Sequence, residues 1–181
     1  MFETLKVVVE DAILPHDKDL ILSVVESIVE LINQNPFTSR IWFLLLNPEI
    51  AQKPVINKKS ELKPPNCIGT ALFVAGLDQI GYPYHAYDDE LGDHTGEFDP
   101  ENLQGRLFSS YRRYPERMIP GAFCFSYSED ADCHAGIYLG QVKGEHILFA
   151  QHGAGGVFCV ETLSGNYTSP DFYIPATLQN R

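Results

Sequence analysis

Cys67 is the residue of this sequence whose type and position most clearly suggest covalent chemistry. It begins the segment 67–77, which is apolar on most faces and is followed by Gly81 and Pro83, a pattern that predicts a buried helix. The first turn of a helix presents unpaired N–H groups and a partial positive charge, which stabilise a thiolate there. The same N–H groups can receive the oxyanion that forms when a thiolate adds to a carbonyl carbon. Cys67 is therefore a candidate nucleophile, and we expect Asn66 to cap the helix.

His134 is the candidate base for this nucleophile. It begins the strand-like segment 134–139, whose next residues are small or apolar, so its imidazole can project from the end of a sheet towards the helix start. Taken alone, each residue has a simpler interpretation. Free cysteine is among the most buried residue types, and a lone histidine at a strand edge commonly bonds to solvent. The motifs around Cys67 and His134 favour the chemical interpretation.

Three motifs follow one another along the chain. They are Asn66-Cys67-Ile68-Gly69, Pro120-Gly121-Ala122-Phe123-Cys124-Phe125, and His134-Ala135-Gly136-Ile137-Tyr138-Leu139-Gly140. In this order they resemble the NlpC family of papain-like cysteine peptidases, in which a cysteine opens a buried helix, a Pro-Gly-Asp turn leads into an apolar strand, and a His-x-Gly-Ile-Tyr strand carries the base. A third polar residue lies on the next strand in that family. The resemblance implies that His152, after the segment 147–151, is this third residue and that it orients the His134 ring.

The resemblance covers about residues 64–161 and implies a Cys67, His134 and His152 triad that cleaves an amide bond. It implies a peptidase or amidase acting on bacterial cell-wall peptides, with no metal ion and no organic cofactor. Two positions differ from the family pattern, because Ala122 replaces the aspartate of the Pro-Gly-Asp turn and Asn66-Cys67-Ile68-Gly69 replaces the usual Asp-Cys-Ser-Gly. These differences lie at orienting positions and not at the nucleophile or the base, so they bear on the expected substrate and subfamily more than on the expected type of reaction.

Two other function classes remain open on the same scaffold. An acyltransferase or thioesterase would use the same cysteine and histidine but would pass the acyl group to a different acceptor or take it from a thioester. A non-catalytic binding module would keep the fold without the reaction, since a fold does not fix a function.

The remaining candidate residues have less specific patterns. Three cysteines are interpreted as core or strand residues: Cys124, Cys133 and Cys159. The adjacent Cys133 and His134 would point to opposite faces of a strand, which argues against a shared metal ion. The acidic stretch 88–94 lacks the ligand spacing of a calcium loop. The glycine-rich stretch 153–156 follows no phosphate-binding pattern, so we expect a flexible turn beside the cleft.

The sequence predicts helices first and strands afterwards. An amphipathic helix is expected over 20–32, with Leu20, Val24, Ile28 and Leu31 buried, and Asn35-Pro36 should end it. The segment 41–46 is either a buried strand or another helical turn, and the proline-rich stretch 47–65 is an irregular connection. Strand-like segments separated by turns then follow, at 122–126, 134–139, 146–152 and 157–161.

This order predicts an α+β fold in which the helices pack on one face of an antiparallel meander. With the resemblance, the expected architecture is papain-like (NlpC-type). Residues 1–62 are expected to form an N-terminal helical extension packed on the core, and residues 63–181 the papain-like cysteine hydrolase domain.

Composition limits the partners. The 181 residues carry a net charge of -11, so a phosphate backbone would be repelled, and no nucleic-acid partner is expected. The one dense basic cluster, Arg112, Arg113 and Arg117, is interpreted as a solvated face. No secretory signal and no apolar run of about 20 residues is visible, so no membrane partner is expected and the chain is expected to be cytoplasmic, with non-classical secretion as an alternative. Composition does not indicate an oligomeric state.

Overall fold

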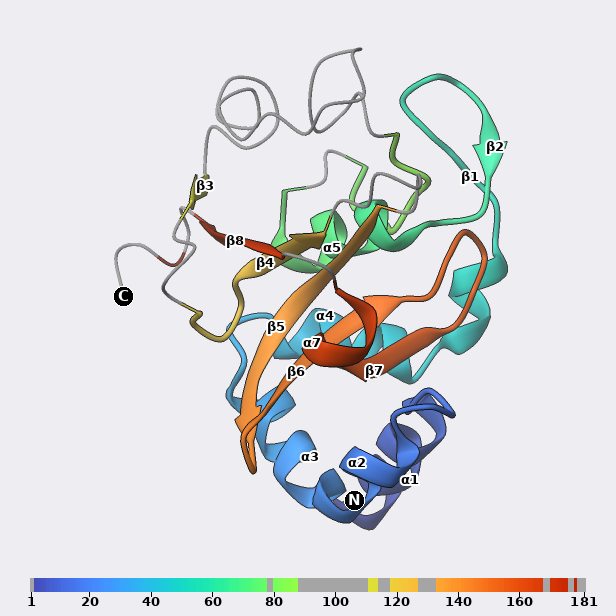
Figure 1. Cartoon of the computed structure of the whole chain (residues 1–181). Helices are drawn as coiled ribbons and strands as arrows, with labels where there is room; N and C mark the ends of the chain where they lie inside the picture. Colours follow the sequence, from blue (N-terminus) through green and yellow to red (C-terminus); the bar gives the residue numbers. More distant parts are fainter. Residues whose placement is uncertain are drawn as a thin grey trace.

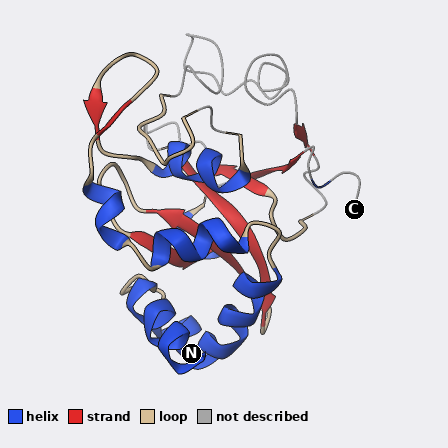
Figure 2. Cartoon of the chain, turned by 180° about the vertical axis from the view of Figure 1, so that it is seen from behind, coloured by secondary structure: helices blue, strands red, loops and turns tan. Residues whose placement is uncertain are grey.

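The computed structural model describes residues 2–77, 80–87, 111–113, 118–126, 133–167, 170–175 and 178, and it is an α+β structure. Its main element is a six-stranded antiparallel sheet in the order β3-β8-β4-β5-β6-β7. The large helices cover one face of this sheet (Figures 1 and 2). Among the described residues, no helix is both long enough and apolar enough to cross a membrane.

The N-terminal third is helical. Its elements are α1 (Phe2–Ala12), α2 (Lys18–Ile21), the 3₁₀ turn η1 (Leu22–Val24), α3 (Val25–Gln34), α4 (Thr38–Leu45) and the 3₁₀ turn η2 (Pro48–Gln52). The amphipathic helix expected over 20–32 is thus divided into α2, η1 and α3. It ends before Asn35-Pro36 as predicted, because proline disfavours helical geometry in the preceding residue. Of the predicted core positions, Val24 and Ile28 are buried and Leu31 is partly buried, while the Leu20 side chain lies outside the described residues.

The segment 41–46, for which strand and helix were both open, is helical. It forms most of α4, whose Ile41, Leu44 and Leu45 are buried. The proline-rich connection that follows contains η2 and a two-stranded hairpin, β1 (Val55–Ile56) and β2 (Leu62–Lys63).

The predicted buried helix is α5, Cys67–Ala75, and all nine of its residues are buried. It ends at Gly76, whose φ of 75° lies in the left-handed region that glycine adopts without strain. The helix packs on the centre of the sheet, against β5 and β6. Cys67 is therefore the first residue of a helix that is surrounded by protein on all sides.

The four predicted strands are present as a meander. They are β4 (Phe123–Ser126), β5 (His134–Val142), β6 (Glu145–Gln151) and β7 (Phe158–Thr162). The sequence did not predict β3 (Tyr111–Arg113) or β8 (Asp171–Pro175), which extend the sheet beyond β4. A short helix, α7 (Leu163–Asn166), follows β7 and lies on the sheet face opposite to α4 (Figure 1).

The N-terminal helices and the sheet share one core. A single cluster joins Val9 and Ile28 from the helices with Leu72 of α5, Ile137 of β5 and Val160 of β7. The N-terminal helices therefore pack directly on the segment that contains the meander.

A polar anchor adds to this packing. Asp17 is only 1% exposed, and its two carboxylate oxygens accept hydrogen bonds from the Thr162 hydroxyl (2.8 Å) and from the Thr162 backbone N–H (3.2 Å). Hydrogen bonds to a charged group contribute about 1.5–3 kcal/mol each, so this contact fixes the start of α2 to the end of β7.

Candidate active site

Asn66 holds Cys67 at the start of α5. The Asn66 side-chain oxygen accepts a hydrogen bond from the Gly69 N–H at 3.0 Å, which is the expected helix cap. The same oxygen accepts from the Ala86 N–H, and the Asn66 amide donates to the Ala86 carbonyl. One side chain therefore caps the helix and fastens a second segment beside it.

Gly69 makes this close packing sterically possible. A Cβ atom at this position would lie 1.8 Å from the Tyr84 carbonyl oxygen, which is backbone and cannot rotate away. The glycine of the Asn66-Cys67-Ile68-Gly69 motif is thus needed to let the segment around Tyr84 lie against the first turn of α5.

Cys67 is 6% exposed, and its Sγ lies 3.6 Å from the Cys133 carbonyl oxygen. The contact places the sulfur at the beginning of β5, where His134 follows Cys133. The structure therefore brings together the helix start and the strand start that the sequence analysis paired.

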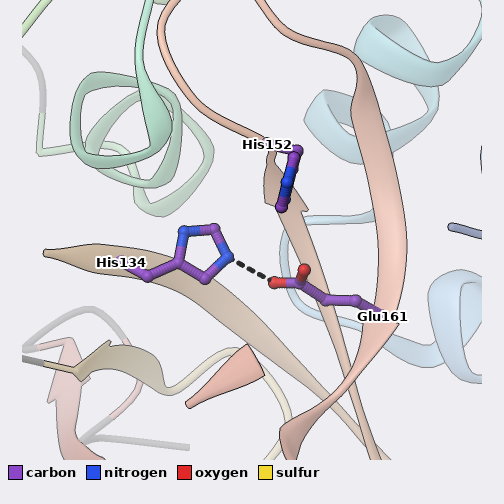
Figure 3. A group of neighbouring side chains, drawn as sticks. All are labelled: His134, His152 and Glu161. Atoms are coloured by element: carbon purple, nitrogen blue, oxygen red, sulfur yellow. Dashed lines mark hydrogen bonds and ion pairs between the residues drawn. The ribbon is translucent and has the colours of Figure 1, made fainter. Parts of the chain in front are cut away.

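His134 lies between two partners. Its Nε2 is 2.8 Å from the Glu161 Oε1 atom, and its Nδ1 points away from Glu161 (Figure 3). The Cys67 side chain also acts on the ring, because its interaction with His134 helps to raise the His134 pKa. Nδ1 does not face Glu161, and it is the nitrogen that we assign to Cys67. The imidazole is therefore influenced by both a thiol and a carboxylate.

Glu161 is completely buried, and its carboxylate has further partners. Tyr167 donates a hydrogen bond from its hydroxyl to the same Oε1 atom at 2.8 Å, and the Cys159 sulfur lies 3.8 Å from Oε2. The Tyr167 ring also packs against the His134 ring, with centroids 4.9 Å apart. A buried carboxylate needs such partners, because an unpaired charge inside a protein is very costly.

Small residues make the space in which these groups meet. Gly136, Ala150 and Cys159 lie side by side in register across β5, β6 and β7. A Cβ atom on Gly136 would come within 2.4 Å of the Tyr167 hydroxyl, so only glycine admits this hydroxyl here. The glycine of the His-x-Gly-Ile-Tyr motif thus makes room for the tyrosine that binds Glu161.

The surroundings of His134 favour its charged form. Burial lowers the pKa of His134, but hydrogen bonds to Cys67 and Glu161 and the negative charge of both outweigh burial and raise the pKa to about 10. A pKa of about 10 corresponds to an imidazolium at neutral pH.

His152 does not occupy the place that the resemblance implied for it. It was expected to orient the His134 ring, but the Nε2 atom of that ring bonds Glu161. His152 is exposed, just beyond the end of β6, and its ring meets the His134 ring edge-on with centroids 6.2 Å apart (Figure 3). Glu161 can extend across the sheet because the residues between it and His134 are small. Its carboxylate therefore lies closer to the His134 Nε2 atom than the His152 ring does.

The same geometry forms a group that could hold a metal ion. His134, His152 and Glu161 each offer one ligand atom, and these atoms lie within 4.8 Å of one another. The sequence analysis weighed Cys133 with His134 and the acidic stretch 88–94 as metal sites, and it did not consider this group.

The turn after His152 is fastened to the chain that leads into α5. Gln151 is fully buried, accepts a hydrogen bond from the Thr70 hydroxyl, and donates to the carbonyls of Ala51, Pro65 and Gly156. Gly155 donates its N–H to the same Pro65 carbonyl at 2.8 Å. The stretch 153–156, expected to be a flexible turn, is thus bonded to the segment that precedes Cys67.

The other cysteines lie in the core or beside it. Burial, followed by the charge of Glu161, raises the pKa of both the Cys124 and the Cys159 thiol well above the usual value, so neither is an available nucleophile. Cys133 is partly buried and packs against the core. The acidic stretch 88–94, the side chains of Arg112 and Arg113, and Arg117 lie outside the described residues.

The sequence analysis missed Glu161 and Tyr167. A signal for Glu161 was present, because it is the one charged residue in the otherwise apolar segment 157–161, and a charge inside a buried strand requires a partner. No comparable signal marks Tyr167. Comparison with protein-family models, with curated proteins and with solved structures gave no significant match.

Proposed function

We propose that the chain is a cysteine hydrolase in which Cys67 is the nucleophile, His134 is the base and then the acid, and Glu161 orients His134. The observation that carries this proposal is the position of the His134 ring between the Cys67 side chain and the Glu161 carboxylate. Nucleophile, base and orienting group in contact are the arrangement on which covalent acyl transfer depends.

In the proposed reaction the Cys67 thiolate attacks the carbonyl carbon of an amide. A C–S bond forms, and the carbonyl π electrons move to the oxygen, where N–H groups at the start of α5 are placed to stabilise them. His134 then gives its Nδ1 proton to the amide nitrogen, and the C–N bond breaks to leave a thioester on Cys67.

Water completes the proposed cycle. His134, now neutral, accepts a proton from the water molecule that attacks the thioester, and the C–S bond breaks to release a carboxylic acid and the thiolate. Glu161 stabilises the imidazolium in both halves of the cycle, and Tyr167 holds the Glu161 carboxylate through its hydroxyl.

The substrate class comes from the resemblance to the NlpC family, and we propose an amide bond in bacterial cell-wall peptides. The α+β order, the helix that begins with Cys67 and the His134-Ala135-Gly136-Ile137-Tyr138 strand support a papain-like fold of this type. Ala122, which replaces the usual aspartate, lies just before β4, is fully buried and belongs to a different core cluster from Cys67.

The test is hydrolysis of purified peptidoglycan fragments, followed by mass spectrometry of the products. Cys67→Ala should abolish cleavage, while Cys124→Ala, which removes a buried thiol whose raised pKa makes it a poor nucleophile, should retain it. Both variants should unfold in urea close to wild type. Equal turnover by Cys67→Ala and wild type would refute the assignment of the nucleophile.

A second measurement separates hydrolysis from the rival acyl-transfer functions. Intact-mass spectra of the protein with a thioester donor report an acyl group on the enzyme, and the same spectra with cell-wall peptides report the proposed intermediate. An acyl-enzyme with thioesters alone would replace the peptidase with an acyltransferase or thioesterase that uses the same Cys67.

A further inference from the structure

We propose that His134, His152 and Glu161 form a Zn²⁺ site on the side of the His134 ring that faces away from Cys67, and that Zn²⁺ bound there inhibits the enzyme. One ligand atom from each of the three residues lies within 4.8 Å of the others, and Figure 3 shows the two rings and the carboxylate converging on one region.

The donor set suits this ion. Two imidazole nitrogens and one carboxylate oxygen are a common set of protein ligands for Zn²⁺, with a fourth position left for water. Bonds of about 2.0–2.2 Å place tetrahedral ligand atoms about 3.4 Å apart. Zn²⁺ would replace the proton that lies between His134 Nε2 and Glu161, so their 2.8 Å contact would open slightly and His152 would move inwards.

The three residues differ in burial in a way that supports entry and retention of an ion. His152 is exposed at a turn, so its ring can adjust and solvent can reach it. Glu161 is fully buried, and its carboxylate is already held by the Tyr167 hydroxyl. Hydrogen bonds of this kind orient metal ligands and raise affinity.

The side of the ring decides which residues take part. The shared ligand would be Nε2 of His134, which faces Glu161, and Cys67 is not one of the three residues whose ligand atoms lie together. Cys67 is therefore not a ligand of the proposed site. This distinguishes it from the incidental capture of zinc by a reactive thiol.

Inhibition follows from the same geometry, and this part rests on the proposed function. A His134 ring bound to Zn²⁺ through Nε2 loses its hydrogen bond to Glu161. The Glu161 carboxylate, now a ligand of the ion, no longer orients the ring towards Cys67. His134 is then held by the metal and not in the position that the proposed reaction needs.

Binding is tested on the metal-free full-length chain, by calorimetry with Zn²⁺ and by absorption spectroscopy with Co²⁺ as a coloured substitute. We expect one bound ion, a four-coordinate Co²⁺ spectrum and no thiolate-to-cobalt charge-transfer band. Cys67→Ala should bind equally well. His152→Ala should weaken binding by about 100-fold or more, since loss of a ligand should cost at least as much as the 10–100-fold that loss of an outer partner costs.

His146→Ala is the matched control, because His146 lies on β6, the strand that His152 follows, and it contacts Tyr138 rather than Glu161. Absence of binding, binding lost in Cys67→Ala, or equal loss in His146→Ala and His152→Ala would each overturn the site. Activity is then measured with and without Zn²⁺. Zn²⁺ binding that leaves hydrolysis unchanged, or raises it, would overturn only the proposed inhibition. If the metal-free protein is inactive but still binds Zn²⁺ through His152, the proposed function fails and the metal site remains supported.

Discussion

The charge of Glu161 should hold His134 in its protonated form, and Glu161→Gln isolates this effect because glutamine has nearly the same shape. The two side chains meet at 2.8 Å in a buried position, where an opposite charge changes a pKa by about 1–3 units. The variant should therefore lower the pKa of His134 from about 10 to between about 7 and 9. At 1.36 kcal/mol per unit, the free energy that favours the imidazolium over the neutral ring decreases by about 1.4–4 kcal/mol.

The assay is a pH titration of the His134 ring nitrogens by NMR, in protein labelled with ¹⁵N-histidine and kept metal-free. His134→Gln identifies the signals by their disappearance. Cys67→Ala, titrated alongside, reports how much of the raised pKa depends on the sulfur. An unchanged His134 pKa in Glu161→Gln would refute the reasoning that the carboxylate stabilises the imidazolium.

The same raised pKa predicts how stability varies with pH. A group whose pKa is higher in the folded state stabilises the fold fully below its unfolded value, here 6.5, and this contribution disappears as the pH rises through about 10. The free energy of unfolding in urea should therefore fall more steeply between these two pH values in wild type than in Glu161→Gln. Parallel pH profiles would contradict the linkage.

Two further substitutions test the packing that positions the site. Gly69→Ala should destabilise the protein by several kcal/mol or displace the segment at Tyr84, because the added Cβ would collide with a backbone carbonyl. Thermal unfolding measures the loss of stability. A melting temperature equal to that of wild type would contradict the close approach. Tyr167→Phe removes a hydrogen bond to Glu161 worth about 1.5–3 kcal/mol. If Glu161 orients His134 as proposed, the variant should lower kcat more than it raises KM, since the hydroxyl contacts the carboxylate and not the substrate. A change confined to KM would contradict a positioning role.

Much of the fold was predictable because its signals are local. The helix that begins at Cys67 has a cap, an apolar run and a glycine end within a few residues, and the four meander strands alternate with turns. The strand β3 gave no such signal, because it is short and is defined by its pairing with β8, about 60 residues later in the chain.

The site was predictable to the extent that its residues open elements. Cys67 and His134 begin a helix and a strand, so their approach follows from packing the helix on the sheet. The partner of His134 did not follow. His152 follows the strand that is adjacent to the His134 strand, whereas Glu161 reaches His134 from one strand further away because Gly136 and its small neighbours leave the space. The contact between His134 and Glu161 depends on the side-chain volumes of residues in three strands. The periodicity of apolar residues in the sequence does not reveal these volumes.

The polar anchor between Asp17 and Thr162, and the bond from Gln151 to Ala51, have a consequence for where this chain can be cut. A fragment that starts at residue 63 would leave Thr162 and Gln151 without hydrogen-bond partners that they have in the whole chain, and it would expose the apolar face on which α3 and α4 pack. Residues 1–62 are therefore part of the folding unit that positions Cys67, His134 and Glu161, and a minimal folded fragment must include them.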